Sequence, residues 1–434
     1  MDKMADVLGR AGAWCGQNKY LSAIKNAFQN FMPLTIAGAI GVLWCNVLVN
    51  ESTGLGIFFK PIMALEFLNP AFQAVNFCTI SCITVGITLG IAQEIGIWNM
   101  GAEKAGYIPG LVGLAAWLSV TNTSHMVEGA KEAFTGIAGN ELGATGLFTG
   151  MIIGVLSVEL FCFFEKQDAL KIKMPEQVPP GVARAFEVLV PATLTLIITA
   201  CIGSACYNLT GLYLNDVIKN GIQGPLGAVG ATIPGVMIIY LVIMLFWLVG
   251  IHGNNMLSAV KEALFTPLAL ENVEKFNKGE KPTNIINMYA LQMWGEFGGS
   301  GVTIGLVIAI MIFGKREDNK AIAGLSLVPG LFNINETVTF GIPMVLNPIL
   351  GIPFVVAPLV TIIIGYVLTV IGFCPVACLT VPWTTPPIVF GFLACGANVM
   401  GAVTQAILIV VSTVIYVPFL ISYEKYQNKQ AAEA

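Results

Sequence analysis

The sequence predicts an all-α protein that crosses a membrane about ten times, because apolar segments of spanning length recur along it. Only 11% of its 434 residues are charged, whereas about 25% is usual in a globular domain. Apolar residues make up 56% of the chain, and the formal net charge is −4. A soluble fold of this size would lack the charges that cover a surface. Composition therefore excludes a disordered chain, a nucleic-acid-binding protein and a cytosolic enzyme.

A spanning helix needs about 20 mostly apolar residues. Two weaker candidates exist: 255–274 is only half apolar, and 284–314 is too long for one straight crossing. Lys and Arg concentrate in the connections that face the cytoplasm if both termini are cytoplasmic, so we expect that orientation. The clearest candidate spans are 31–50, 71–92, 104–121, 144–164, 185–207, 226–250, 348–372 and 398–421.

The chain is expected to divide into three parts. Residues 1–30 combine basic residues with apolar ones at near-helical spacing, which predicts an amphipathic helix on the cytoplasmic face of the membrane. A basic connection at 165–184 lies between the fourth and fifth spans. We expect an N-terminal five-span half at 31–215 and a C-terminal five-span half at 216–434.

Two stretches in the C-terminal half, 320–346 and 374–396, are too apolar for solvated loops. Pro, Gly and Asn interrupt both too often for one helix. Irregular backbone at membrane depth is tolerated only where it is packed in protein or lines a cavity. We therefore expect two re-entrant hairpins, which is where a transporter places its binding site.

The first hairpin holds an acidic residue among carboxamides: Asn333, Asn335 and Glu336 stand within four positions. An acidic side chain at the centre of a spanning helix costs about 2.5–3.5 kcal/mol. A mixture of acceptors and donors suits a hydroxyl-rich ligand. The alternative is a capping or turn cluster, since Asn is common in both roles. The cost of the charge favours a binding role for Glu336.

A second candidate follows a very apolar span. His252 stands between Gly250 and Gly253, where the backbone can unwind, and Asn254 follows; the span before them contains Trp247. Imidazole and carboxamide groups also suit sugar hydroxyls. The alternative is a His that caps the C-terminus of a helix near the negative end of its dipole.

Trp383 and Thr384 form the third feature, inside a Pro-rich run of the second hairpin. A Trp that prolines hold in place offers a flat apolar face to the C–H groups of a sugar. The alternative is an interfacial belt Trp. Trp247, Trp294 and Glu296 are weaker candidates of the same kind.

No metal or cofactor is expected. The ten cysteines lie mostly in apolar runs, which indicates small buried hydrophobic residues, and the chain has two histidines. The sequence has no GxxxxGK[ST] phosphate loop, and no Arg lies inside a clear span. The energy source is therefore expected on another protein.

Three motifs together resemble a known family: the sequence reads GIHGNN at 250–255, FNINET at 332–337 and VPWTTPP at 381–387. They are similar to the membrane-spanning IIC subunit of bacterial sugar phosphotransferase systems, in its lactose/cellobiose/N,N′-diacetylchitobiose branch. The similarity covers essentially the whole chain and implies a bacterial plasma-membrane permease. His252 and Glu336 would correspond to the invariant His and Glu of that family.

The resemblance also implies partners and a mechanism. A IIC permease imports a β-linked disaccharide, and phosphocysteine on a IIB protein phosphorylates the 6-hydroxyl. IIA and the general phosphotransferase proteins act upstream. Family members form homodimers through the N-terminal half and bind sugar in the C-terminal half. We expect IIB to be a separate protein, the lipid bilayer to be the surroundings, and no autonomous catalysis by this chain.

Three other functions are alternatives for a protein with this sequence. An ion-coupled sugar symporter is the main alternative. A membrane-bound glycosyl- or lipid-transferase would need an acidic metal site or a basic pyrophosphate cluster in a span, which the sequence lacks. A passive channel fits less well, because a single carboxylate between carboxamides suits a binding site better than an ion pore.

Overall fold

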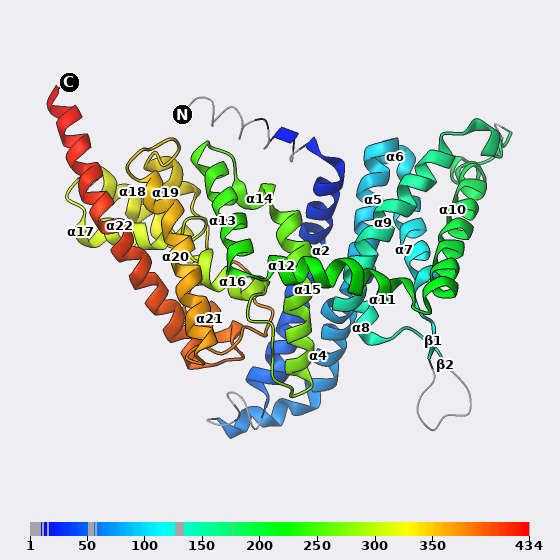
Figure 1. The fold of residues 1–434 in the computed structure, drawn as a ribbon, viewed down its shortest axis with the longest axis horizontal. Helices are drawn as coiled ribbons and strands as arrows, with labels where there is room; N and C mark the ends of the chain where they lie inside the picture. Colours follow the sequence, from blue (N-terminus) through cyan, green and yellow to red (C-terminus); the bar gives the residue numbers. More distant parts are fainter. Residues whose placement is uncertain are drawn as a thin grey trace. The chain divides into compact units, whose positions relative to one another are not determined.

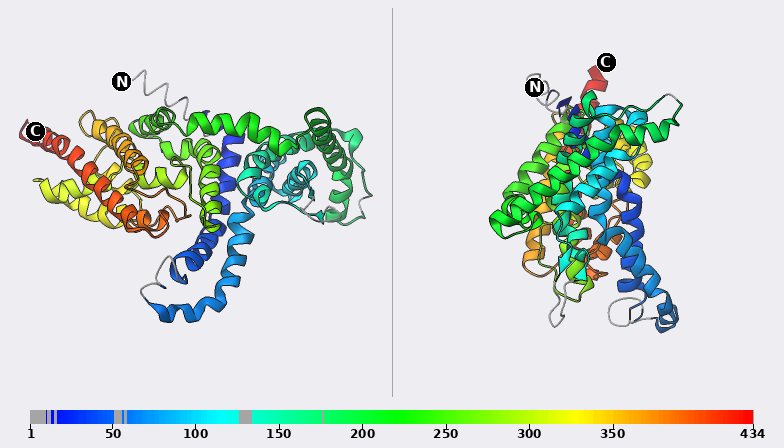
Figure 2. Two further views of the ribbon diagram at one scale, coloured as in Figure 1. Left: turned by 60° about the horizontal axis from the view of Figure 1, so that its bottom comes forward. Right: turned by 90° about the vertical axis from the view of Figure 1, so that its right-hand side faces the viewer.

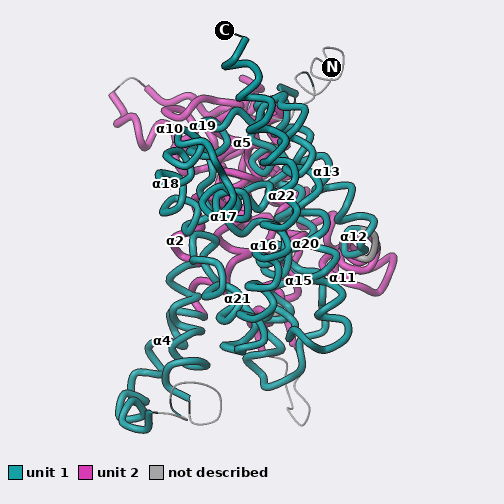
Figure 3. The backbone as a smooth tube through the Cα atoms, turned by 90° about the vertical axis from the view of Figure 1, so that its left-hand side faces the viewer, with its two compact units in different colours: residues 1–16, 36–76, 229–434 teal, residues 17–35, 77–228 magenta. Residues whose placement is uncertain are grey.

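The computed structural model describes residues 10, 13–14, 17–50, 56, 59–125, 134–175 and 177–433. Helices dominate this part of the chain (Figure 1). The described residues form two compact units, which Figure 3 distinguishes by colour. One unit contains segments 36–76 and 229–434, and the other contains segments 17–35 and 77–228.

The unit formed by 17–35 and 77–228 is built from helices and one short antiparallel hairpin, in which Ser124 pairs with Thr135. Its first helix, α2, continues into the other unit. The elements are α2 (Lys19–Leu43), η3 (Phe77–Ser81), α5 (Ile83–Met100), α6 (Ala102–Ala105), α7 (Ile108–Val120), β1 (Ser124–His125), β2 (Phe134–Thr135), α8 (Gly139–Leu142), α9 (Ala144–Glu165), η4 (Asp168–Leu170), α10 (Pro180–Thr210), α11 (Leu214–Ile218), η5 (Lys219–Gln223) and α12 (Gly224–Gly230).

The unit formed by 36–76 and 229–434 contains the broken helices that the sequence placed in its second half. Its elements after the end of α2 are η1 (Trp44–Leu48), η2 (Lys60–Leu68), α4 (Asn69–Asn76), α13 (Ile233–Leu248), α14 (Gly253–Met256), α15 (Ser258–Asn277), α16 (Met288–Gly295), α17 (Ile304–Phe313), α18 (Glu317–Leu331), α19 (Glu336–Gly341), α20 (Gly351–Val370), α21 (Val389–Ala394) and α22 (Val399–Glu433).

Five helices in the described residues are long and apolar enough to cross a membrane, or up to seven if each of two bent pairs is one span. The helices overlap the expected apolar segments, but their breaks and ends differ. In 71–92 the helix is interrupted at Cys82, and α5 runs on to Met100. In 104–121, α6 ends at Ala105, Gly106 takes a positive φ of 52°, and α7 begins at Ile108. In 226–250 the helix α13 begins at Ile233, after extended backbone at Thr232.

The expected boundary at residue 30 falls inside α2, which runs without interruption from Lys19 to Leu43. Most of the first 16 residues of the predicted amphipathic helix lie outside the described part of the chain. The two predicted hairpins also differ from each other. The stretch 320–346 contains the helical pair α18 and α19, whereas 374–396 is non-helical except for α21.

Close packing of α5, α7 and α9 forms the core of the unit that contains 77–228 (Figures 1 and 2). Small residues make the helix contacts possible. A Cβ on Gly113 would overlap the side chain of Ala92, and one on Gly150 would overlap that of Thr88. In lipid, helices associate through such backbone approach rather than through the hydrophobic effect.

Several carboxylates in this unit have polar partners, as expected for charges near a membrane. Glu94 accepts a hydrogen bond from Asn26 (2.8 Å), and Glu159 contacts Lys19 (2.6 Å). Glu187 lies 2.8 Å from Arg184, one turn earlier in α10.

Glu165, at the end of α9, is the most buried of these acids, with 1% of its side chain exposed. Its Oε1 lies 2.8 Å from Nζ of Lys104, 3.1 Å from Nη1 of Arg184 and 4.0 Å from Nζ of Lys171. The carboxylate therefore joins the α6 segment, the α9–α10 connection and the start of α10.

We predict that Glu165→Gln destabilises the protein by about 2–3 kcal/mol, because three cations then lose their shared counter-charge. A lower apparent melting temperature of the purified protein in detergent would show this. Glu433→Gln is the control, since the Glu433 side chain is 66% exposed and contacts only Lys429 among described ion pairs. Equal melting temperatures for both variants would contradict the prediction.

Candidate functional site

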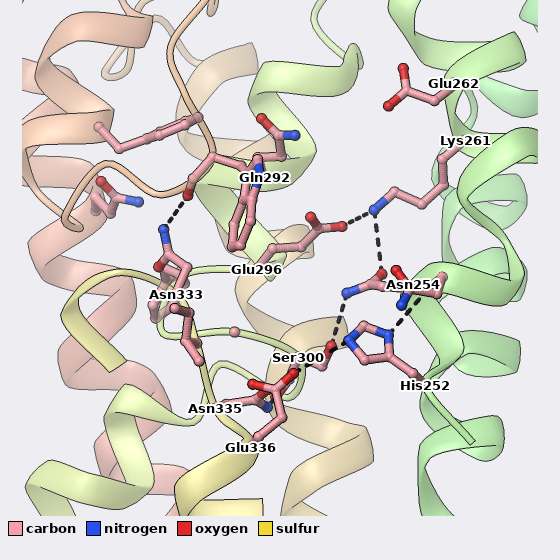
Figure 4. A pocket seen from close by; sticks show the side chains of 17 residues that line it. His252, Asn254, Lys261, Glu262, Gln292, Glu296, Ser300, Asn333, Asn335 and Glu336 are labelled. Carbon is pink, nitrogen blue, oxygen red and sulfur yellow. Dashed lines mark hydrogen bonds and ion pairs between the residues drawn. The ribbon is translucent and has the colours of Figure 1, made fainter. Parts of the chain in front are cut away.

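A cavity of about 570 Å³ lies within the unit that contains 229–434. This volume is in the range of about 300–1,000 Å³ that is usual for small-molecule sites. The cavity collects side chains from the α13–α15 region, the α16–α17 connection, the α18–α19 turn and the second irregular stretch (Figure 4). Seven of the ten candidates from the sequence line it, all except Trp247, Trp294 and Thr384: His252, Asn254, Glu296, Asn333, Asn335, Glu336 and Trp383.

His252 reaches the cavity because α13 ends just before it. Gly250 has a φ of +82°, a conformation that residues with a Cβ rarely adopt, and the chain turns there. His252 then caps the short helix α14, and its Nδ1 accepts a hydrogen bond from the backbone N–H of Asn255 (3.2 Å). The sequence predicted the unwound turn and left a His that caps a helix C-terminus as the alternative; the cap that His252 makes is at a helix start.

This cap fixes the chemistry of the imidazole. Because Nδ1 of His252 accepts, the neutral ring carries its proton on Nε2. Nε2 lies 3.8 Å from Oε1 of Glu336, too far for a direct hydrogen bond (Figure 4). The two atoms are too close for a hydroxyl oxygen to lie on the line between them, but an oxygen beside the pair can accept from the His252 N–H and donate to the carboxylate. The pair can therefore bind an alcohol.

Trp247 and Thr384 are not among the residues that line the cavity. The indole of Trp247 is buried and lies against the imidazole of His252, with ring centroids 4.4 Å apart and planes tilted by 48°. The ring of Phe354 also packs on it in an edge-to-face arrangement, with centroids 6.3 Å apart and planes at 78°. Trp247 thus supports His252 from behind.

The α18–α19 turn is a helix cap built on Asn333. Its φ is +62°, its backbone N–H bonds to the carbonyl of Gly330 (3.0 Å), and the N–H of Ile334 bonds to the carbonyl of Pro329 (3.0 Å). These two bonds around a left-handed residue form a Schellman motif, in which Asn is the usual substitute for Gly. The backbone of Asn333 therefore caps α18, which is the capping role that the sequence analysis gave as the alternative for this cluster.

Asn335 is buried, with 3% exposure, and its Nδ2 donates to the carbonyl of Ser300 (2.7 Å). The Ser300 segment approaches closely: a Cβ on Gly299 would lie 2.7 Å from the Cβ of Asn335. Gly299 also has a φ of +87°. Glycine is therefore needed at this position for two reasons: the positive φ, and the close packing of the α16–α17 connection on the turn.

Glu336 begins α19 directly after these anchors, and its side chain is 47% exposed on the cavity side. Within the described residues, the ion pairs include none between Glu336 and a Lys or Arg. Both carboxylate oxygens are available to a ligand. The sequence predicted this acid as the centre of the site from the cost of an unpaired charge at membrane depth.

Sequence reasoning missed Lys261, whose side chain is 7% exposed in α15. Its Nζ contacts Oε1 of Glu296 and lies 3.3 Å from Oδ1 of Asn254 (Figure 4). The hydroxyl of buried Tyr240 also donates to Oε1 of Glu296 (2.7 Å). Oε2 of Glu296 has no hydrogen-bond partner within the described residues and remains for a ligand.

The network extends across the cavity, since Nδ2 of Asn254 donates to Oγ of Ser300 (2.9 Å). Glu262 lines the cavity next to Lys261 and accepts a hydrogen bond from Thr266 one turn later. The sequence feature that could have identified both residues is the adjacent Lys-Glu pair in the half-apolar segment 255–274. No grouping of three or more potential metal ligands occurs in the described residues.

The comparisons with known proteins agree with this architecture. The model of the family Phosphotransferase system, EIIC matches residues 25–358. The chain belongs to this family of integral membrane sugar permeases. It is similar to a solved structure, that of the transporter ChbC, the IIC component from the N,N′-diacetylchitobiose-specific phosphotransferase system. The TM-score is 0.88, with 29% identity and 97% coverage of each chain.

Two curated relatives are similar over nearly their whole length. The oligo-beta-mannoside-specific EIIC component of Bacillus subtilis (strain 168) is 32% identical over 98% of this chain and 94% of its own. The cellobiose-specific EIIC component of Lactococcus lactis subsp. lactis (strain IL1403) is 29% identical over 98% of both chains. The family identified from the three sequence motifs is confirmed.

We predict that Lys261→Met destabilises the protein by about 3–5 kcal/mol, because it leaves the Glu296 carboxylate buried without a counter-charge. The double variant Lys261→Met/Glu296→Gln should recover much of the loss, since it removes the orphaned charge. Apparent melting temperatures of the single and double variants measure this. A double variant that is less stable than Lys261→Met would contradict the ion-pair explanation.

Proposed function

We propose that this chain binds a neutral β-linked disaccharide of the cellobiose or diacetylchitobiose type and holds it for phosphorylation at the 6-hydroxyl. The phosphoryl donor is a separate, phosphorylated IIB protein, supplied by IIA and the general phosphotransferase proteins. The family assignment and the sugars named for similar proteins support this proposal. The chain contributes binding and positioning, and a IIB cysteine contributes the phosphoryl group.

The observation that carries the proposal is the pairing of His252 with Glu336. An N–H donor and a carboxylate acceptor lie 3.8 Å apart in the lining of the cavity. A sugar hydroxyl is both donor and acceptor and therefore satisfies both groups at once. We assign the 6-hydroxyl to this position.

The mechanism follows from these two groups. Glu336 accepts the proton of the 6-hydroxyl as its oxygen attacks the phosphorus of phosphocysteine, and the S–P bond breaks to release the IIB thiolate. The Nε2–H of His252 holds the attacking oxygen in line. Phosphoryl transfer asks little more of a protein than such positioning and electrostatic stabilisation. The charged product cannot return across the hydrocarbon core and leaves toward the cytoplasm.

The remaining cavity groups suit the rest of a disaccharide. Oε2 of Glu296 accepts from a hydroxyl or an acetamido N–H, and the partly exposed ring of Trp383 packs on the C–H face of a pyranose. Both lie in the same cavity as Glu336, which favours a ligand longer than one ring. The side chains of Asn254 and Asn335 are bonded to Ser300 and shape the wall between these groups.

We also propose the membrane arrangement that the sequence predicts. The chain crosses the bacterial plasma membrane ten times with both termini in the cytoplasm. The stretches 320–346 and 374–396 are re-entrant hairpins. The helical pair α18–α19 and the non-helical path around α21 support the hairpins. The half at 31–215 forms a homodimer, and the half at 216–434 carries the cavity, which agrees with the location of its lining residues.

The competing function is an ion-coupled sugar symporter. The cavity contains three carboxylates that can bind and release a proton during transport: Glu262, Glu296 and Glu336. Lys261 already pairs with Glu296, and the family assignment favours a phosphoryl donor over an ion gradient.

We predict that Glu336→Ala lowers the affinity for cellobiose or diacetylchitobiose by about 100-fold or more, because hydrogen bonds to a charged group are lost. Calorimetric titration of the purified protein measures the affinity. Glu317→Gln is the matched control on α18, because the Glu317 side chain is 87% exposed. Unchanged sugar binding by a folded Glu336→Ala variant would reject the role of this acid.

We predict that proteoliposomes accumulate sugar only as its 6-phosphate, and only when phosphorylated IIB is present on the cytoplasmic side. In the proposed mechanism, phosphorylation is the only source of free energy that drives accumulation of the sugar. Radiolabelled cellobiose, followed by separation of free and phosphorylated sugar, tests this. Accumulation of unmodified sugar under a proton or sodium gradient alone would establish the symporter instead.

A further inference from the structure

The side chain of Asn333 lies where three segments that line the cavity meet. Its Oδ1 accepts a hydrogen bond from the backbone N–H of Gly298 (2.6 Å), in the α16–α17 connection. Its Nδ2 donates to the backbone carbonyls of Trp383 (2.5 Å) and Thr385 (3.1 Å), in the second irregular stretch. Asn333 itself belongs to the α18–α19 turn (Figure 4).

The three partners also fix the orientation of the carboxamide. An N–H partner requires the oxygen, and two carbonyl partners require both hydrogens of the amide nitrogen. Both amide hydrogens of Asn333 are therefore used within the protein. Only one lone pair of Oδ1 remains for a ligand, which makes Asn333 a poor direct partner for a sugar.

Each of these contacts is close to a group proposed to touch the sugar. Gly298 is two residues after Glu296, Trp383 is itself such a group, and Asn333 is three residues before Glu336. The backbone here has few regular hydrogen bonds, because the segments 296–303 and 375–388 are non-helical. Side-chain bonds must therefore hold them in place.

We propose that Asn333 is a positioning residue that clamps the Trp383 segment and the Glu296 loop to the turn that carries Glu336. The proposal rests on the proposed sugar-binding function and replaces the role of direct ligand for Asn333. The clamp sets the distance between the stacking ring and the carboxylate, and thereby matches the cavity to one spacing of sugar rings.

Asn is suited to this position for two reasons. It tolerates the left-handed backbone of the helix cap, as Gly does. It also combines a short donor and acceptor in one plane. Asp would keep the bond from Gly298 but would turn a carboxylate toward two carbonyl oxygens. Gly would keep the cap and lose all three side-chain bonds.

A double-mutant cycle tests whether Asn333 acts through Trp383. We expect Asn333→Gly and Trp383→Ala each to weaken binding of the preferred disaccharide about tenfold. The double variant should be weaker than wild type by much less than 100-fold, because the clamp has no ring left to position. Independent, multiplying losses would show that Asn333 binds the sugar directly and would overturn the proposal.

Asn347→Gly is the matched control. The carboxamide of Asn347 also makes three backbone hydrogen bonds, to the carbonyl of Pro343 and from the N–H groups of Ile349 and Leu350, but Asn347 does not line the sugar cavity. Its loss should leave disaccharide affinity within about twofold of wild type. An equal loss of affinity in both Gly variants would mean that the loss comes from lower stability of the whole protein, and it would reject the clamp.

Hydrogen exchange without sugar provides an independent readout of the clamp. Asn333→Gly and Asn333→Asp should both speed exchange of the amide hydrogens between 383 and 388, outside the two prolines, by tenfold or more, whereas Asn347→Gly should not. Unchanged exchange in these residues would overturn the clamp. If the wild type binds no disaccharide, the proposed function fails while the exchange result still decides the clamp.

Discussion

The site depends on one constraint: non-helical backbone packed inside the protein must have its N–H and C=O groups bonded. Two carboxamides from the α18–α19 turn meet part of this demand. Asn333 bonds to Gly298, Trp383 and Thr385, and Asn335 bonds to Ser300. Glu336 follows directly after them, so the same contacts that stabilise the unwound segments also hold the carboxylate at the cavity.

The charges of the cavity divide into two kinds. Glu296 is neutralised by Lys261 and bonded to Tyr240, so it is held in one orientation with one oxygen left over. Glu336 lies 3.8 Å from His252 and has no other ion pair among the described residues. A fixed acid at one end and an unsatisfied donor–acceptor pair at the other suit a neutral polyhydroxylated ligand, because hydroxyl groups supply hydrogen bonds without adding charge.

Most of the residues that the sequence singled out line one cavity, because the features that mark them are local. Glu336, His252 and Trp383 stood out by residue type and by the breaks around them, and all three line the cavity. Lys261 was missed because a lysine in a half-apolar segment gives no sign of its partner. Trp247 and Asn333 were assigned as ligands, but the first lies behind His252 and the second is bonded to backbone groups. Those contacts join residues far apart in the chain.

The sequence by itself determined the helical membrane class, the family, and the unwound motifs that carry Glu336 and His252. Composition, apolar segment length and local Gly, Pro and Asn patterns are sufficient for these. Only the tertiary structure decided which polar groups face the cavity and which bond to one another. Backbone partners of side chains such as Asn333 depend on how separate segments pack, and periodicity along one segment carries no information about its neighbours in space.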